Sequence, residues 1–405
     1  MDKKKKIVLV GTYYEQSHGD ALLFDCLKYL YYTIGNKKNI QFDFVICDMF
    51  AKNKIDNTIK LSKHKHGSLH FIKKTFKSVV HSIVSSKSLR LLINREYIGQ
   101  KHLREYYYSK FIGSDMIVIA GGGILKYSVR ANFSPIFKDI IQTATDLNIP
   151  VIINAIGIEG RHNSKDNDFT TFKNVLNNPI VKMCTTRDRI DVLEEYYKDN
   201  EHANFMKISD TGVWASEAFS VQKAPNSKII GLNVITPSRF TDYGKDITKQ
   251  TLLSFWSQVI QILDDKQYEF RLFTHGLADD ELFAREIIAF CDLDEDKLTP
   301  VPNNQFELVN NISNFKGIVA NRLHACIVAY SLDIPAIGIA WNDKLLYWGK
   351  EIKYPNRFFD FDQLDPLKIV ESLEEAIKEG HDQKHISLMK DSVFNSINES
   401  FSFMN

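Results

Sequence analysis

The sequence predicts an α/β protein built from two doubly wound domains, and three observations support this fold class. Short apolar runs rich in Val and Ile alternate with longer amphipathic stretches, as expected for parallel strands buried on both faces and connected by helices. The alternation stops in a polar, proline-containing stretch at residues 222–228 and then starts again. The length of 405 residues also indicates two or three domains.

The first half of the chain is expected to form five strands with helices between them. The expected strands are, in chain order, residues 6–12, 42–48, 115–123, 150–158 and 181–187. Helical patterns between them include residues 20–33 and 135–147. We therefore expect a Rossmann-like N-terminal domain over residues 1–221, with a basic helical insertion at about 55–110.

The second half repeats this organisation beyond the linker at residues 222–228. Four expected strands are residues 228–235, 268–275, 317–320 and 335–341, and helical patterns cover residues 246–264, 279–291 and 323–332. We expect a C-terminal domain over residues 229–365, followed at 366–405 by helices that pack back on the first domain. Two such domains bind ligands in the cleft between them, at the carboxyl ends of the strands.

The composition excludes several classes of protein. A net charge of +1 does not indicate a nucleic-acid-binding protein. The five cysteines form no CxxC pair, so we expect neither a zinc site nor disulfides, but reduced thiols in a cytoplasmic protein. No clustered metal-ligand pattern appears, and no apolar run reaches the roughly 18 residues that span a bilayer.

The segment of residues 60–110 differs from the rest of the chain in its charge. It holds twelve basic and two acidic residues, a local charge of +10. Apolar residues recur within it at helical spacing, namely Ile72, Phe76, Val79, Val80, Ile83 and Val84. This amphipathic helix either packs on the first domain, docks on an anionic membrane or receives an anionic glycan.

Two glycine motifs follow the first and third expected strands. The first strand ends near Gly11, and Ser17-His18-Gly19-Asp20 then opens a helix whose free N–H groups favour an anion. Asp20 alternatively serves only as a helix cap. The third strand ends in Gly121, Gly122 and Gly123, which permit close approach of a ligand or simply form a tight turn.

Cationic residues are also expected at the cleft. Arg187, in Thr186-Arg187-Asp188, closes a strand, where a guanidinium suits a carboxylate or phosphate. The alternative is an Arg187–Asp188 surface pair. In the second domain a strand delivers Asn321, Arg322 and His324, and Lys344 follows the next strand, so one histidine and two cations should converge.

A polar loop follows another strand of the second domain. It contains Thr274, His275 and Gly276, with Asp279 and Asp280 beyond. We expect His275 and Asp280 at the cleft edge in contact with a substrate, whereas the alternative is that Asp279 or Asp280 caps the next helix.

Taken together, these motifs resemble the polysaccharide pyruvyl transferase family. The resemblance lies in the GD after the first strand, the GGG, the TRD, the RLHA at residues 322–325 and a lysine twenty residues beyond its histidine, and it runs from about residue 7 to 350. Its most specific part is RLHA followed by IPAIGIAWNDK. The family more often has Asn ahead of the GD and Ser ahead of the RLH, where this chain has Ser17-His18 and Asn321.

The resemblance implies two facing Rossmann-like domains, as in GT-B glycosyltransferases, and phosphoenolpyruvate as donor with no further cofactor. It places the catalytic arginine, histidine and lysine on Arg187, His324 and Lys344. The expected acceptor is a sugar of a surface or capsular polysaccharide or its lipid-linked precursor. Two alternatives remain: a nucleotide-sugar glycosyltransferase that uses a late acidic residue such as Glu281, and a non-catalytic saccharide-binding protein.

Overall fold

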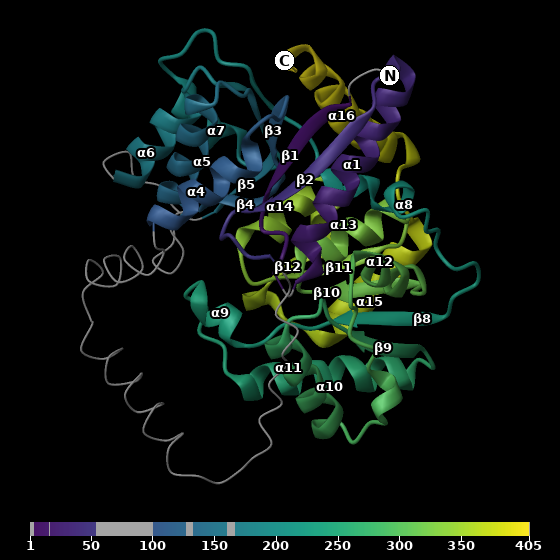
Figure 1. Ribbon diagram of the computed structural model, residues 1–405. Helices are drawn as coiled ribbons and strands as arrows, with labels where there is room; N and C mark the ends of the chain where they lie inside the picture. The colour runs from purple at the N-terminus through teal and green to yellow at the C-terminus, as the bar shows by residue number, and fades with distance from the viewer. Residues whose placement is uncertain (1–3, 16, 54–99, 127–132, 160–166, 405) are drawn as a thin grey trace, which may run out of the picture.

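The computed structural model describes residues 4–15, 17–53, 100–126, 133–159 and 167–404 (Figure 1). Most of the basic segment, including the expected amphipathic helix, lies outside these residues. Within the described ranges, no helix is both long and apolar enough to cross a bilayer.

The first sheet is entirely parallel and has seven strands. Its order is β2-β1-β3-β5-β6-β7, and β4 pairs with β5. The strands are β1 (Lys5–Gly11), β2 (Phe42–Asp48), β3 (Met116–Ile119), β4 (Gly122–Lys126), β5 (Val151–Glu159), β6 (Val181–Thr186) and β7 (Phe205–Lys207).

The second sheet is also parallel and has five strands in the order β12-β11-β10-β8-β9. They are β8 (Ile229–Asn233), β9 (Glu269–Phe273), β10 (Gly317–Ala320), β11 (Ala336–Ala340) and β12 (Phe358–Asp360). The two all-parallel sheets confirm the prediction of two doubly wound α/β domains.

Helices cover both faces of both sheets, because the strands are apolar on each face. On the outer face of the first sheet lie α4 (Gln100–Phe111), α5 (Ser134–Asp146), α6 (Asn167–Leu176) and α7 (Ile190–Tyr197). On the outer face of the second sheet lie α10 (Lys249–Asp265), α11 (Ala278–Phe290) and α15 (Pro366–Glu379).

The layer between the two sheets is one continuous apolar cluster. It contains residues of α1 (His18–Lys38), α8 (Ala215–Ala218), α12 (Gln305–Ser313), α13 (Leu323–Ser331), α14 (Asp343–Glu351) and α16 (Gln383–Ser400). Phe315 and Ile318 of the second domain belong to the same cluster as Ile7 and Leu9 of the first. The domains therefore share a core and are more than loosely linked.

The C-terminal helix returns to the first domain. The Tyr31 hydroxyl of α1 and the Ser400 hydroxyl of α16 lie 2.9 Å apart, and Asn204 donates to Glu399 at 3.0 Å. Figure 1 shows α16 beside α1, with both chain ends at the same end of the molecule. The preceding helix α15 instead packs on the second sheet, since Ile369 and Leu373 belong to its outer cluster.

The structure corrects the expected strand at residues 115–123. β3 ends at Ile119, and β4 is a separate strand that begins at Gly122 and pairs only with β5. The break coincides with the glycines, one of which, Gly122, has φ +90° and therefore interrupts an extended run. The short edge strands β7 and β12 and the small helix α9 (Ser238–Asp242) were also not expected.

Candidate active site

The topology of each sheet points to one edge as the ligand-binding edge. In the first sheet the chain runs from β1 outward to β2 and then returns to the other side of β1 at β3. In the second sheet β8 and β10 flank the same kind of reversal. Ligands of open α/β sheets bind at such switch points, beyond the carboxyl ends of the strands. The two switch points bring α1 and α13 together.

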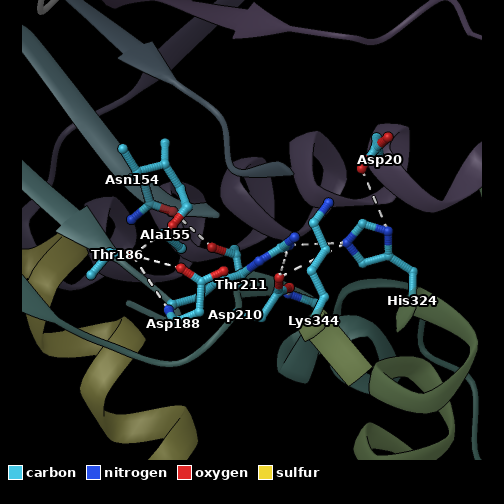
Figure 2. Close-up of polar contacts among 12 residues, drawn as sticks. Asp20, Asn154, Ala155, Thr186, Asp188, Asp210, Thr211, His324 and Lys344 are labelled. Carbon is cyan, nitrogen blue, oxygen red and sulfur yellow. Dashed lines mark hydrogen bonds and ion pairs between the residues drawn. The ribbon is translucent and has the colours of Figure 1, made fainter. Parts of the chain in front are cut away.

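His324 lies at the start of α13 and reaches across to the first domain (Figure 2). Its Nδ1 is 3.5 Å from Oδ1 of Asp20, and its Nε2 is 3.3 Å from Nη1 of Arg187. Nε2 is also 3.9 Å from Oδ2 of Asp210. Because Nε2 faces the Arg187 donor, the arrangement suits the tautomer that carries its proton on Nδ1, toward Asp20.

The surroundings of His324 favour its neutral form. Burial lowers the pKa of the imidazole, and the charges of Arg187 and Arg322 act in the same direction. Asp20 and Asp210 oppose this shift without overcoming it. A neutral imidazole has one ring nitrogen without a proton, so the site is suited to general base chemistry.

Arg187 lies behind His324 and is almost fully buried. Its Nη1 donates to Asp210, which also accepts the Gly212 N–H at 2.8 Å. Burial disfavours the charge, but Asp210 and Asp188 outweigh this effect and raise the pKa of Arg187. The alternative of an Arg187–Asp188 surface pair is therefore wrong.

The end of β5 is shaped to admit the Arg187 side chain. A Cβ on Gly157 would lie 3.0 Å from Nη2 of Arg187 and 3.1 Å from its Nε, so the absence of a side chain here leaves room for the guanidinium. The register of β5 against β6 shifts between Ile153 and Ile156, and Ala155 has φ 47°. Beyond this shift, Glu159 at the end of β5 contacts Lys344 and Tyr243 of the second domain.

Lys344 belongs to a second group of side chains from both domains. It contacts Glu159, the last residue of β5, and the same carboxylate lies 3.2 Å from Nζ of Lys126. The Tyr243 hydroxyl donates to Glu159 at 2.6 Å. Burial lowers the pKa of Lys344 to about 7, and Lys126 adds to the shift while Asp20 opposes it.

The remaining expected residues of the second domain form a support around this centre. Arg322 donates to Asp280 from Nε at 3.1 Å and also from Nη2, and Asp280 accepts the Thr236 N–H. Asn321 is buried and donates to the Ile339 carbonyl at 3.2 Å, which ties β10 to β11. Both residues are therefore engaged within the protein.

His275 contacts the first domain rather than an open cleft edge. Its carbonyl accepts the His18 N–H at 3.1 Å, and its Nδ1 would lie 3.0 Å from a Cβ on Gly19. Burial, with the nearby Arg322, lowers the pKa of His275 well below its usual value. The alternative that Asp279 or Asp280 caps α11 is wrong, since Leu277 holds the cap position.

The expected glycines divide into two groups. A Cβ on Gly11 would lie 3.0 Å from the Phe24 ring, and one on Gly121 would lie 3.0 Å from Leu23, so both permit close packing of α1. A Cβ on Gly122 would instead lie 3.5 Å from Asp20, and one on Gly123 would overlap Glu159 and Lys344. Only the latter pair faces the charged side chains. Ser17, rather than Asp20, is the N-cap residue of α1.

Sequence reasoning missed four residues of this arrangement: Asp210, Glu159, Lys126 and Tyr243. Asp210 comes after β7, a strand of three residues that are not fully buried. The sequence therefore has no continuous apolar run that predicts a strand before Asp210. Glu159 could have been found, since it is the charged last residue of a long, otherwise apolar strand. Within the described residues, no group of three or more His, Cys, Asp or Glu is arranged to hold a metal, and all five cysteines are free.

The fold and this site define a two-domain α/β protein of the GT-B architecture, with an acid–base and cationic centre between the domains. The polysaccharide pyruvyl transferase family matches the chain over residues 18–343, which is most of its length. The chain belongs to this family, whose activity is polysaccharide pyruvyl transfer. A search of characterised protein sequences gives no match.

Solved structures agree with the fold. The UDP-GlcNAc 2-epimerase of Methanocaldococcus jannaschii has a TM-score of 0.56 at 10% identity, with 98% of this chain and 99% of that chain covered. A candidate UDP-N-acetylglucosamine 2-epimerase of Listeria monocytogenes has a TM-score of 0.55 at 9% identity, with 99% and 95% covered. At such identities the likeness shows the architecture alone.

Proposed function

We propose that this protein transfers the pyruvyl group of phosphoenolpyruvate to two hydroxyls of a sugar and so forms a pyruvate ketal. The observation that carries the proposal is the position of His324. It comes from the second domain, is buried, which lowers its pKa, and lies between Asp20 and Arg187 of the first domain.

The reaction needs proton transfer and charge stabilisation in one place. Two acceptor hydroxyls lose their protons; one proton converts the donor's methylene carbon into a methyl group, and the other leaves with inorganic phosphate. Neutral His324 is suited to take a proton from a hydroxyl. Arg187 and Lys344 are suited to the negative charge of the donor carboxylate and of the departing phosphate.

The direct test is phosphate release from phosphoenolpyruvate in the presence of a panel of sugar acceptors. We expect release that depends on the acceptor, with a product heavier than the acceptor by one pyruvyl group. A parallel panel with UDP-sugars tests the glycosyltransferase alternative. Turnover of UDP-sugars without turnover of phosphoenolpyruvate would overturn the proposal, and turnover of neither donor would favour a non-catalytic saccharide-binding protein.

The structure offers a specific check on the nucleotide-sugar alternative. That alternative needs an acidic residue presented to a ribose, and Glu281 was the candidate. Glu281 is buried, accepts the hydroxyl of Thr274, and burial raises its pKa. It is therefore engaged inside the second domain.

The acceptor is proposed to be a lipid-linked precursor of a surface or capsular polysaccharide, used at the cytoplasmic face of the membrane. The support is the charge of +10 over residues 60–110. Basic side chains near an anionic surface contribute about 1 kcal/mol each to binding. Sedimentation with anionic vesicles should show binding that weakens with salt and after charge reversal of Lys73, Lys74 and Lys77. No binding at low salt would contradict this part of the proposal.

A further inference from the structure

The acidic residues around the site differ in how firmly they are held. Asp210 accepts the Gly212 N–H, Asp280 accepts the Thr236 N–H, and Asp188 accepts the Ile158 and Arg189 N–H groups. Backbone donors fix these three carboxylates in place, because moving them would leave buried N–H groups unpaired. None of the three can move aside easily for a ligand.

Glu159 is held differently. Within the described residues, the hydrogen-bond and ion-pair partners of its carboxylate are all side chains, namely Lys126, Lys344 and Tyr243. Lys126 belongs to the first domain and the other two to the second, so the carboxylate closes a gap between the domains. A glutamate on a long side chain whose partners are all side chains can be displaced without leaving a buried backbone N–H group unpaired.

The place that the Glu159 carboxylate occupies is built for an oxyanion. Two lysines and one phenol converge on it, and Gly123 lines it with bare backbone because a Cβ there would overlap Glu159 and Lys344. Arg239 lies close enough to affect the pKa values of Lys126 and Tyr243, and its nearest acid, Asp242, is 3.8 Å away. Cations therefore outnumber the carboxylate they surround.

Binding of the anionic donor requires cations that are not held by a fixed carboxylate. Arg187 and Arg322 are already paired with fixed carboxylates. Phosphoenolpyruvate brings a phosphate and a carboxylate, and each needs cationic partners when desolvated. The lysines that Glu159 now engages are the cations that can be released for this purpose.

We propose that the Glu159 carboxylate occupies a subsite for an oxyanion made by Lys126, Lys344 and Tyr243, and that an anionic group of the donor displaces it on binding. The identity of the donor rests on the proposed function, whereas the subsite itself requires only an oxyanion. Both the phosphate and the carboxylate of the donor have this chemistry.

Calorimetric titration with two probes tests the subsite. Inorganic phosphate represents one end of the donor, and pyruvate represents the carboxylate end. If Glu159 fills the subsite in about nine molecules of ten, its removal raises the apparent affinity about tenfold. We therefore expect the Glu159→Gln variant to bind one of the two probes about tenfold more tightly than the unmodified protein, and the probe that responds identifies the group that binds there.

Two further variants complete the test. Lys126→Met removes a cation from the subsite and should weaken binding of the same probe severalfold. Glu374→Gln is the matched control, because Glu374 also accepts a lysine and a tyrosine, Lys266 at 2.8 Å and Tyr268 at 3.3 Å, but on the outer face of the second domain. Its affinity for the probe should equal that of the unmodified protein.

Weaker or unchanged binding of both probes to Glu159→Gln, in a variant that unfolds at the usual temperature, would overturn the proposal. If that variant does not fold, unchanged binding in Lys126→Met overturns it instead. The titrations read binding without turnover. Tighter binding in Glu159→Gln with no pyruvyl transfer to any acceptor would support the subsite and contradict the proposed function. Pyruvyl transfer by the unmodified protein, together with weaker probe binding in Glu159→Gln, would support the proposed function and contradict the subsite.

Discussion

At the scale of single residues, the site depends on a histidine whose two ring nitrogens face different partners. His324 has Asp20 on its Nδ1 side and Arg187 on its Nε2 side, and each partner acts on its pKa in the opposite direction. The donor and acceptor roles of the ring are thereby set before a substrate binds. Two predictions follow from this geometry.

The first prediction concerns His324 itself. His324→Ala should lower turnover about a hundredfold or more, the usual contribution of a general acid or base. The measurement is the rate of phosphate release at saturating donor. The exposed His202 provides a control, since His202→Ala should retain full turnover. A His324→Ala enzyme with normal turnover would remove the residue from the mechanism.

The second prediction concerns Asp20 as a positioning residue. Its charge raises the pKa values of both His324 and Lys344, so Asp20→Asn should lower both. If neutral His324 and protonated Lys344 are the active forms, both limbs of the pH profile of kcat/KM should move to lower pH. In the unmodified protein, donor affinity should fall as the pH rises through the Lys344 pKa of about 7. In Asp20→Asn the same fall should occur at a lower pH. A profile that keeps its position would show that Asp20 does not act through these groups.

Arg187 is better tested by Arg187→Lys than by Arg187→Ala. Loss of the whole side chain would leave Asp210 buried without its cation, and breaking a buried pair costs about 3–5 kcal/mol of stability. A lysine retains the charge but loses the planar set of donors. Arg187→Lys should therefore weaken donor binding more than it lowers the stability of the fold.

At the scale of elements, the start of α14 positions Lys344. The Asn342 side chain caps this helix by accepting the Lys344 N–H at 3.2 Å. The third prediction is that Asn342→Ala lowers the free energy of unfolding by about 1 kcal/mol and also raises KM for the donor. Denaturation curves and initial rates measure the two effects.

Asp365 supplies the matched control for this cap. It caps α15 by accepting the Leu367 N–H at 3.0 Å, on the outer side of the second domain. Asp365→Ala should cost similar stability without changing KM. If both variants leave KM unchanged, the cap does not position Lys344 for the donor.

The elements also show what could be predicted from the sequence and why the rest could not. Long buried strands can be recognised in the sequence as continuous apolar runs. The bounds of β2 were therefore predicted as observed, and those of β5 within one residue. His324 and Lys344 were predicted to converge because each follows an expected strand, whereas the family resemblance grouped Arg187 with them. Asp210 comes after β7, a strand of three residues at the edge of the first sheet. Its ion pair with Arg187 joins residues 23 positions apart, and no local sequence pattern predicts such a contact.

The glycines illustrate the same limit. Gly11, Gly121 and Gly123 are equivalent in sequence terms, since each ends or follows a strand. Only the packing of Phe24 and Leu23 against the first two, and of Glu159 and Lys344 against the third, distinguishes a packing glycine from one that lines a site. That distinction depends on contacts far apart in the chain.

At the scale of the whole molecule, the shared core sets the distance between the Arg187 and His324 side chains. Arg187 of the first domain and His324 of the second lie 3.3 Å apart. The reason is the continuous apolar layer, in which α13 packs against the segment of residues 211–214. A small wedge in this layer should therefore affect both stability and catalysis.

Gly212 is the position for such a wedge. A Cβ there would lie 3.0 Å from Cγ2 of Ile327 in α13 and 3.0 Å from Oδ1 of Asp210. The fourth prediction is that Gly212→Ala pushes α13 away from the first domain, lowers the free energy of unfolding by about 1–3 kcal/mol, and reduces kcat because His324 moves relative to Arg187. Gly317→Ala is the control, because its Cβ would lie 3.1 Å from Leu373 and Ile377 within the second domain alone. It should lose comparable stability while keeping kcat, and an equal loss of kcat in both variants would show that catalysis does not depend on this interdomain contact.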